Sequence, residues 1–491
     1  MNHEEEMMSI RSVNPRTGEE FGPTFESTPQ SEINSMIMNA VASYTQWSRT
    51  APKERARILN LLAESIDANV APLVAIADLE TGLGAVRLTG EVARTTYQIR
   101  TFADALIDGE LIDSILDEAV DAPLPAGHPK FLRTLRAIGP VAVFGASNFP
   151  FAFSILGGDT ASALAAGCSV VIKAHPAHPQ TSQLTFDIAT KALSDAKAPK
   201  NLIALGHGFE FGKLVITDPR ITAGAFTGSR TGGRALFDMA ASRTTPIPFY
   251  GELGSVNPVI AMSSGIPDPA VFIGTYLDSL LLGNGQFCTN PSLLFVPEDE
   301  YFVADLKSQL SHREALPFLS EATKNLHDAN RVKLSESFGA TDLVGKNTES
   351  SGFYSRAEIF VIPASVAMVK SEKLNIECFG PTGVVITYSS VDEVREILSM
   401  LEGALVGSLF SSVDDQSNVE IVSTLASVCG RVTFNAWPTG VAVTDGQHHG
   451  GPYPASTSPL HTSVGIHAIG RFLRPVTFQG LPDELAGKLS S

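Results

Sequence analysis

The chain has 491 residues, of which 44% are apolar and 18% are charged, a composition typical of globular proteins. One hydrophobic core does not extend over this length, so we expect two or three domains. The formal net charge of −17 argues against general binding to nucleic acid or to an anionic membrane, because both repel an acidic surface.

The cysteine pattern bears on the cellular compartment. Cys168, Cys288, Cys378 and Cys429 are far apart and form no CxxC pair, which suits a reducing cytosol and gives no zinc-site signature. The acidic residues 1–15 lack the apolar core of a secretory signal, and no apolar stretch approaches the length that crosses a bilayer. We therefore expect a cytoplasmic protein that spans no membrane.

Residues 30–110 show helical periodicity, with Ser31 as the expected N-cap of the first helix. The Pro- and Gly-rich residues 121–129 predict a crossing segment or linker. After it, short β-branched runs alternate with helical stretches, and the runs lie at 141–145, 169–174 and 223–229. This alternation predicts a parallel sheet with helices on its faces.

A second region of similar alternation begins near residue 251 and runs to about residue 450. Residues 470–479 are typical of a short strand that pairs with a sheet edge. The chain therefore reads as an α/β protein with at least two parallel-sheet units.

Cys288 lies in the Gly- and amide-rich stretch GNGQFCTNP, just after an apolar run. Most cysteines in soluble proteins are small buried hydrophobes without chemistry. A nucleophilic cysteine needs a base, an oxyanion site and an acceptor for electrons or a leaving group. The function of Cys288 therefore depends on what other residues supply.

Two residues next to predicted strands offer these groups. Asn148 carries an amide that can donate to a developing oxyanion, or simply cap the following turn. Glu252 precedes a buried strand, where partial burial raises a carboxyl pKa and favours a general base. A single Glu in this place is as well explained by a surface or capping role.

Two further turns are notable, and the first of them suits a nucleotide. In AFTGSRTGGRAL, Gly228, Ser229 and Gly233 lie between a strand and a helix, where backbone N–H groups can approach a pyrophosphate. In IECFGPTGVV, Glu377 and Phe379 precede a Gly-Pro turn, where an exposed carboxylate is usually only solvated. Each feature, taken singly, also has an ordinary structural explanation.

Together, Asn148, the FTGS turn, Glu252, Cys288 in GQFC and Glu377 in ECFGP occur in an order and at intervals that resemble the aldehyde dehydrogenase superfamily. The resemblance runs from NPRTGE near the N-terminus to FNAWPTG (434–440) and beyond.

This resemblance implies an α/β fold with a Rossmann-type cofactor-binding domain, an α/β catalytic domain and a small bridging β arm. The expected boundaries are 1–120 and 140–252 for the NAD(P)-binding domain, 253–450 for the catalytic domain, and 121–139 and 451–491 for the bridging, oligomerisation segments. It also implies a homodimer or homotetramer.

The family precedent assigns Cys288 as the nucleophile that attacks an aldehyde to form a thiohemiacetal. The Asn148 amide and the Cys288 backbone N–H would hold its oxyanion. Hydride transfer to the nicotinamide would leave a thioester, which water activated by Glu252 would hydrolyse. Relatives that pass the thioester to coenzyme A often lack this Glu, so its presence favours hydrolysis. No metal is required.

The resemblance also places the cofactor. Glu377 would bind the nicotinamide ribose with Phe379 against it, and Lys173 would reach the adenine-side ribose. Relatives that prefer NAD usually have a Glu three residues after this Lys, where this chain has Pro176. Without that carboxylate a 2′-phosphate meets less repulsion, and Lys173 and His175 could attract it.

This departure favours NADP, or dual use with NAD. His207 is a weaker candidate for the phosphate. Alternatively, Pro176 only shapes the loop and NAD binds through Lys173.

Residues 157–182, 225–236 and 437–465 resemble one branch of the family, the α-ketoglutaric semialdehyde (2,5-dioxopentanoate or 2,5-dioxovalerate) dehydrogenases, which deliver 2-oxoglutarate. The same branch also resembles the NADP-linked fatty aldehyde dehydrogenases. Both are therefore kept as hypotheses for the small-molecule aldehyde substrate.

The two substrates need different side chains. A carboxylate on the substrate calls for an Arg, and Arg87 and Arg94 lie two turns apart on a predicted helix that also carries Arg100. Alternatively, these arginines pair with Glu80 or Glu91 on the surface. A fatty chain calls instead for an apolar tunnel, and the aromatic residues that could line it, or grip a short substrate, are Phe151, Phe153 and Phe287.

Two other function classes remain open. Some proteins of this fold have lost the nucleophile and act as binding or structural proteins, which the presence of Cys288, Glu252 and Asn148 argues against. An activated cysteine beside an oxyanion site also hydrolyses activated esters. We regard that as a side reaction of the same site.

Overall fold

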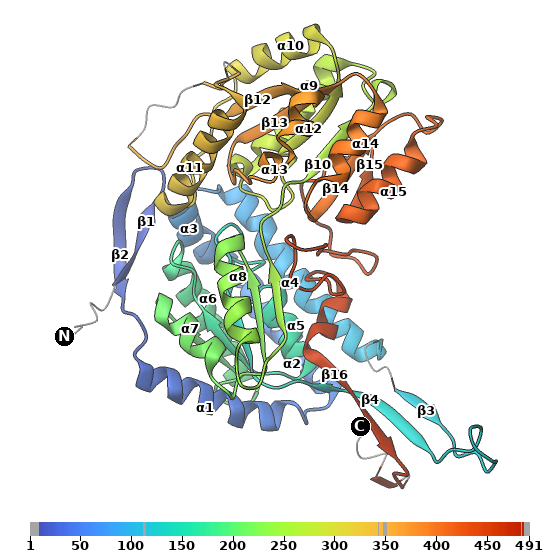
Figure 1. The fold of residues 1–491 in the computed structure, drawn as a ribbon. Helices are drawn as coiled ribbons and strands as arrows, with labels where there is room; N and C mark the ends of the chain where they lie inside the picture. The colour runs from blue at the N-terminus through green and yellow to red at the C-terminus, as the bar shows by residue number, and fades with distance from the viewer. Residues whose placement is uncertain (1–8, 111–113, 342, 347–350, 483, 486–491) are drawn as a thin grey trace.

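The computed structural model describes residues 9–110, 114–341, 343–346, 351–482 and 484–485. Residues 1–8, in which no signal was expected, lie outside this part of the chain. Figure 1 shows two α/β units and a projecting β arm.

Helices fill residues 30–108, as the periodicity predicted. They are α1 (Gln30–Trp47), α2 (Pro52–Asp67), α3 (Val70–Thr81) and α4 (Ala85–Asp108). The expected N-cap at Ser31 is wrong: α1 begins at Gln30, Pro29 holds the N-cap position, and no side chain caps the helix. Pro fits there because it has no N–H to satisfy.

The first parallel sheet has the strand order β7-β6-β5-β8-β9. Its strands are β5 (Val141–Phe144), β6 (Val170–Lys173), β7 (Ile203–Gly206), β8 (Ala223–Thr227) and β9 (Phe249–Glu252). The helices that alternate with them are α5 (Gly158–Ala166), α6 (Pro179–Asp195), α7 (Phe209–Thr217) and α8 (Arg230–Ala241).

The strand order reverses between β5 and β8, because β6 and β7 extend the sheet one way and β9 the other. Ligands of open α/β sheets bind at such a switch point, beyond the carboxyl ends of the strands. Asn148 follows β5, Lys173 ends β6, Ser229 follows β8 and Glu252 ends β9. Four of the predicted site residues therefore share this edge of the sheet.

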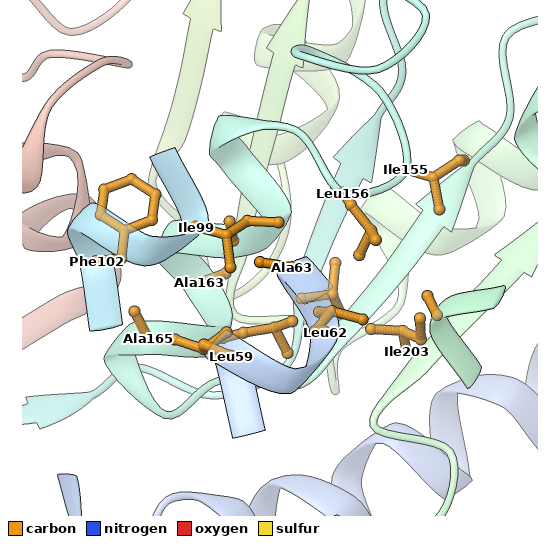
Figure 2. Packing of buried hydrophobic residues seen from close by; sticks show 14 of the residues in the cluster. Leu59, Leu62, Ala63, Ile99, Phe102, Ile155, Leu156, Ala163, Ala165 and Ile203 are labelled. Carbon is orange, nitrogen blue, oxygen red and sulfur yellow. The ribbon is translucent and has the colours of Figure 1, made fainter. Parts of the chain in front are cut away.

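The core of the first unit lies between α2, α4, α5 and the sheet (Figure 2). Alanines alternate there with larger side chains, which lets α2 and α4 pack closely against each other and against α5. The labelled members are Leu59, Leu62, Ala63, Ile99, Phe102, Ile155, Leu156, Ala163, Ala165 and Ile203.

The second parallel sheet has the order β12-β13-β11-β10-β14-β15. Its strands are β10 (Pro258–Ala261), β11 (Leu293–Pro297), β12 (Glu358–Pro363), β13 (Thr382–Tyr388), β14 (Ala404–Phe410) and β15 (Cys429–Phe434). Its helices are α9 (Pro269–Leu281), α10 (Glu300–Ser311), α11 (Glu321–Phe338), α12 (Ala364–Val369), α13 (Ser371–Leu374), α14 (Val391–Ser399) and α15 (Asn418–Val428). Separate apolar clusters cover its two faces.

The projecting arm is an antiparallel sheet of order β16-β4-β3 (Figure 1). It consists of β3 (Ile115–Asp117), β4 (Phe131–Ala137) and β16 (Leu473–Gln479), so the predicted C-terminal strand does pair with a sheet edge. The preceding 3₁₀ helix η3 (Ile466–Phe472) instead packs against α5 and α4 in the first unit. A hairpin of β1 (Ile10–Asn14) and β2 (Glu19–Phe25) precedes α1.

No single described helix is long and apolar enough to cross a membrane. Only α2 and α3, taken together across a 67° bend, have the necessary length and composition, and both contribute buried residues to the core.

Candidate active site

Cys288 follows a turn whose backbone explains the sequence GNG. Gly283, Asn284 and Gly285 have φ angles of 56°, 62° and 69°, in the left-handed region that favours Gly and tolerates Asn. A Cβ at position 285 would also lie 2.1 Å from the carbonyl oxygen of Gly380. The turn brings the chain directly from α9 to Cys288.

Hydrogen bonds from the second unit hold this loop in place. The Cys288 carbonyl accepts from Nδ2 of Asn257 at 2.8 Å, and Oε1 of Gln286 accepts from the Leu319 backbone at 3.0 Å. Cys288 is partly exposed, whereas Cys168, Cys378 and Cys429 are buried. Of the four thiols, Cys288 is therefore the one open to a small molecule.

Glu252, at the end of β9, faces Cys288 together with His449. Nε2 of His449 lies 3.0 Å from Oε1 of Glu252 and 3.7 Å from Sγ of Cys288. Ser463 donates to Oε2 of the same carboxylate at 3.2 Å, and Oγ1 of Thr462 accepts from the His449 backbone at 2.9 Å. The arrangement joins a thiol, an imidazole and a carboxylate.

The protonation of this cluster differs from the sequence expectation. Burial alone would raise the pKa of Glu252, but the His449 imidazole and the hydrogen bonds from His449, Cys288 and Ser463 outweigh it, so the pKa lies below its usual value. The predicted raised pKa of Glu252 is therefore wrong. The carboxylate remains ionised at neutral pH, which keeps it available as a proton acceptor.

The Cys288 thiol shows the opposite shift. Burial, the negative charge of Glu252 and the hydrogen bond to it raise the pKa of Cys288 well above its usual value. Before substrate and cofactor bind, the thiol form therefore predominates at neutral pH. Its activation requires transfer of the proton to a neighbouring group.

Asn148 reaches the same place from the end of β5. Its Nδ2 donates to the Gln286 carbonyl at 3.0 Å, two residues before Cys288. An amide nitrogen carries two hydrogens, so a second donor remains on Nδ2. The Asn148 carbonyl accepts from Nη2 of Arg87 at 2.7 Å, which fixes the loop between β5 and α5.

Arg87 and Arg94 of α4 line this region. Arg87 lies over the Phe149 and Phe287 rings at 5.2 and 4.6 Å, and Arg94 lies over Phe153 at 5.2 Å. In each guanidinium, Nη1 is buried and has no hydrogen-bond partner among the described residues. Buried donors of this kind are normally satisfied, which suggests a ligand acceptor.

The alternative that these arginines pair with Glu80 or Glu91 on the surface is wrong, because both carboxylates are buried. Glu80 accepts from the Thr181 backbone at 2.8 Å, and Glu91 accepts from the Phe151 backbone at 2.8 Å. Glu91 still interacts electrostatically with Arg87 and Arg94, although no ion pair joins them among the described residues. Arg100 pairs with Asp67 at 2.7 Å on the outside of the unit.

The structure brings two of the three predicted phenylalanines together. Phe149, which the sequence analysis missed, makes edge contacts with Phe153 and Phe287 at centroid distances of 5.4 and 5.3 Å. Phe151 belongs instead to the core cluster of the first unit. Aromatic walls and the two guanidinium groups therefore lie beside one another next to Cys288.

The predicted phosphate ligands differ in charge. Burial lowers the pKa of Lys173 to about 8, and no described residue accepts a hydrogen bond from its ammonium. Burial, with His178 and Lys173 nearby, lowers the pKa of His175 well below its usual value, so this ring is neutral at neutral pH. The expected ionic attraction of His175 is therefore absent, and Lys173 carries the charge. Pro176 is exposed beside them.

His207 lies at the end of β7 and stacks on Phe25 at 5.0 Å. Burial and the Lys173 charge lower its pKa to about 4, so it too is neutral at neutral pH. Its Nε2 is buried without a hydrogen-bond partner among the described residues. It can accept or donate a hydrogen bond but attracts no anion by charge.

The Gly-rich turn opens α8. Ser229 is its N-cap and accepts from the Gly232 backbone at 3.3 Å, which leaves the first N–H groups of the helix near the sheet edge. The Gly228 N–H donates to the Glu252 carbonyl at 3.1 Å. A Cβ on Gly233 would lie 2.1 Å from Cδ2 of Leu253, so close packing explains this glycine.

Glu377 precedes Phe379 in the second unit and points at Gly254, where a Cβ would lie 1.7 Å from its Oε2. Burial raises the pKa of Glu377 to about 7, although a hydrogen bond from the Ser255 backbone partly offsets this. Such a half-ionised, buried carboxyl is available to a hydroxyl donor. Phe379 is partly buried beside it.

Three residues of the candidate site were missed from the sequence: His449, Ser463 and Phe149. His449 lies in the stretch DGQHHGGPYPA, which was noted for its resemblance but not for its imidazole. The pair of histidines was the available signal, and nothing local shows which one faces Cys288.

The sequence profile of the aldehyde dehydrogenase family matches residues 2–474. The chain is 36% identical to α-ketoglutaric semialdehyde dehydrogenase 2 of Azospirillum brasilense, covering 97% of this chain and 92% of that protein. It is 35% identical to α-ketoglutaric semialdehyde dehydrogenase of Acinetobacter baylyi, covering 97% and 93%.

Solved structures share the fold at lower sequence identity. 1-Pyrroline-5-carboxylate dehydrogenase from Thermus, solved with NAD, aligns with a TM-score of 0.82 at 20% identity, over 96% of this chain and 90% of that one. Aldehyde dehydrogenase C from Pseudomonas syringae, solved with NAD⁺ and octanal, aligns with a TM-score of 0.81 at 21% identity, over 97% and 94%. The family profile, the relatives and the fold agree: this chain belongs to the aldehyde dehydrogenase family.

Proposed function

We propose that this enzyme oxidises 2,5-dioxopentanoate to 2-oxoglutarate with NADP. The observation that carries the choice of substrate is the pair of buried guanidinium groups of Arg87 and Arg94, each with an unpartnered Nη1. Arg94 lies close enough to Cys288 and Glu252 to interact with their charges. A substrate carboxylate supplies the missing acceptors while its aldehyde lies at the thiol. The names of the two relatives at 36% and 35% identity support the same substrate.

Different residues of the chain would carry out the successive steps. His449 stands between Sγ of Cys288 and Oε1 of Glu252, so it can pass the thiol proton toward the carboxylate. The thiolate attacks the aldehyde carbon, and the free Nδ2 hydrogen of Asn148 with the Cys288 N–H stabilises the oxyanion of the thiohemiacetal.

Loss of hydride from the thiohemiacetal to a bound cofactor would leave a thioester, whose hydrolysis needs a water and a base. A cavity of roughly 20 Å³, enough for one water, is lined by Glu252, His449 and Ser463, among others, but not by Cys288, so a water there would move to reach the thioester. Once Glu252 has passed the thiol proton on to solvent, its carboxylate is ionised again and can take a proton from that water. The acid product then leaves and Cys288 regains its proton.

The carboxyl edge of the first sheet fits a dinucleotide, because the Lys173 ammonium and the buried Nε2 of His207 both lack described partners there. Lys173 would hold the adenine-side ribose and a 2′-phosphate, with His175 and His207 as neutral hydrogen-bonding groups. When bound, the nicotinamide supplies the hydride acceptor. Glu377 would hold its ribose hydroxyls, and the first N–H groups of α8, which follow the N-cap Ser229, would face the pyrophosphate.

Three architectural proposals follow. Residues 1–120, apart from the arm strand β3, and residues 140–252 bind the cofactor, and residues 253–450 carry the nucleophile. The arm formed by β3, β4 and β16 joins subunits of a cytoplasmic homodimer or homotetramer.

A medium-chain or long-chain aldehyde is the second candidate, because Phe149, Phe153 and Phe287 form an apolar wall. The deciding experiment measures kcat/KM for 2,5-dioxopentanoate and for octanal, each with NADP and with NAD. We expect a preference of at least about 100-fold for the dicarbonyl acid, since each charge-assisted hydrogen bond contributes about 1.5 to 3 kcal/mol.

The Arg94→Met variant should lose that preference, whereas Arg100→Met, on the outer side of the same helix, should keep it. A preference for octanal in the unaltered enzyme would reject the dicarbonyl acid and favour the fatty aldehyde. No turnover with any pair would indicate a non-catalytic relative.

A further inference from the structure

The Cys288–Glu252–His449 cluster has a second property that aldehyde oxidation does not use. The three potential ligand atoms, Sγ of Cys288, a carboxylate oxygen of Glu252 and a ring nitrogen of His449, all lie within 4.8 Å of one another. They come from three separate parts of the chain: the loop after α9, the end of β9 and the segment before η3. Thiolate, carboxylate and imidazole together are a ligand set that Zn²⁺ prefers.

The spacing also fits tetrahedral zinc. With Zn–S of about 2.3 Å and Zn–N and Zn–O of about 2.1 Å, tetrahedral angles separate the sulfur and nitrogen by about 3.6 Å and the nitrogen and oxygen by about 3.4 Å. The Sγ–Nε2 and Nε2–Oε1 distances are 3.7 and 3.0 Å. The third pair, Sγ and a Glu252 carboxylate oxygen, lies within 4.8 Å. These side chains therefore close the site around an ion by shifts of no more than about 1 Å.

The groups around the cluster favour metal binding of moderate affinity. The thiolate and the carboxylate neutralise a dication, and the Ser463 hydroxyl orients the carboxylate through Oε2. The positive charges of Arg94 and Arg431 interact with Cys288 and weaken the attraction of the cluster for a cation. Three protein ligands leave a fourth position for water.

We propose that this cluster binds one Zn²⁺ ion and that the bound ion reversibly inhibits the enzyme. Binding releases the thiol proton of Cys288 to solvent, and Nε2 of His449 coordinates the ion through its lone pair while the ring hydrogen is on Nδ1. The ion then occupies the nucleophile and the base together. The inference depends on these three side chains and not on which aldehyde is oxidised.

The test uses the purified full-length enzyme without aldehyde or cofactor and Co²⁺ as a spectroscopic substitute for Zn²⁺. We expect one Co²⁺ per chain, a near-ultraviolet thiolate-to-cobalt charge-transfer band and the visible bands of tetrahedral cobalt. Added Zn²⁺ should remove these bands. Zn²⁺ should also inhibit turnover, and a chelator should restore it.

Variants then locate the ion. The charge-transfer band should disappear in Cys288→Ser, and Ser463→Ala should weaken Co²⁺ binding by about tenfold, as loss of a group that orients a metal ligand does. His461→Asn is the matched control, because this nearby histidine bonds to Ser458 and not to the cluster. It should bind Co²⁺ normally.

The proposal is overturned if no charge-transfer band forms, or if the band persists in Cys288→Ser. Because the band requires no turnover, an enzyme that binds Co²⁺ but oxidises no aldehyde would reject the proposed function alone. Conversely, an active enzyme without the band would reject the metal site alone.

Discussion

Nε2 of His449 lies 3.0 Å from Oε1 of Glu252, although the two residues are 197 positions apart in the sequence. The same nitrogen is 3.7 Å from the Cys288 sulfur. One imidazole therefore connects the nucleophile to the carboxylate that the family precedent assigns as the base. The net pKa shift of Glu252 depends on this contact.

Replacing His449 by Asn should lower kcat/KM by about 10²- to 10⁴-fold, the usual contribution of a group that transfers a proton. The cause is the loss of the relay between the Cys288 thiol and Glu252. Steady-state kinetics across pH measure this, and the loss should shrink as rising pH ionises the thiol directly. The control His467→Asn, at an exposed histidine, should retain the activity, and an equal loss in both variants would refute the relay.

Glu252→Gln should change the reactivity of the Cys288 thiol and the turnover of aldehyde in opposite directions. The negative charge of Glu252 raises the pKa of Cys288, so the amide should increase the thiolate fraction and speed alkylation by iodoacetamide at neutral pH about tenfold. Turnover should fall in the same variant, because thioester hydrolysis loses its base.

The measurement is alkylation rate against pH without cofactor, with Cys288→Ser defining the reaction at other sites. In the unaltered enzyme the rate should climb with pH throughout the neutral range. If Glu252→Gln were alkylated more slowly, Glu252 would mainly activate Cys288 by accepting its proton. The effect of its negative charge on the Cys288 pKa would then be the smaller one.

Glu377→Gln should stabilise the enzyme at alkaline pH. Below its ordinary pKa of 4.5 the Glu377 carboxyl is protonated both folded and unfolded, so the pKa shift costs nothing. Between pH 4.5 and about 7 the folded state keeps a proton that the unfolded state loses, and stability falls as pH rises. Above that range the penalty is constant, at most about 3 kcal/mol.

Calorimetric melting at about pH 5.5 and about pH 8.5 should therefore show a larger gain for Glu377→Gln at the higher pH, where the penalty is complete. Glu372→Gln, an exposed carboxylate of α13, is the control and should show no such difference. The Glu377 variant should also raise the KM for the cofactor if Glu377 binds the ribose. An equal gain at both pH values would contradict a buried, titrating carboxyl.

Pro176→Glu should shift cofactor preference from NADP toward NAD. The new carboxylate would face the 2′-phosphate beside Lys173, and like charges at such distances cost about 1 to 4 kcal/mol, so the NADP/NAD ratio of kcat/KM should fall about 5- to 1,000-fold. Pro176→Gln removes the proline without adding charge. If it shifted the ratio equally, the loop shape rather than the charge would decide the preference.

Much of the fold could be predicted from the sequence. Apolar spacing located α1 to α4, and the alternation of strands with helices predicted both parallel sheets, because periodicity reports the backbone geometry of neighbouring residues. Local rules still misplaced the start of α1, where Pro29 and not Ser31 holds the N-cap position.

Within the candidate site, the order of Asn148, Glu252 and Cys288 was sufficient to recognise the family, which the family profile confirms. The GNG turn also had a local explanation, since three successive left-handed residues require Gly and Asn. The sequence by itself thus determined the sheet architecture, the family and the nucleophile that the family precedent names.

Only the tertiary structure decided how these groups interact. Of two adjacent histidines, His449 contacts Glu252, and the pKa of that carboxyl is lowered instead of raised. His175 is neutral, and Phe151 lies in the core. The tertiary structure also left Nη1 of Arg87 and of Arg94 without partners among the described residues. Charge and hydrogen bonding depend on burial and on side chains brought from distant parts of the chain, and no local pattern carries that information.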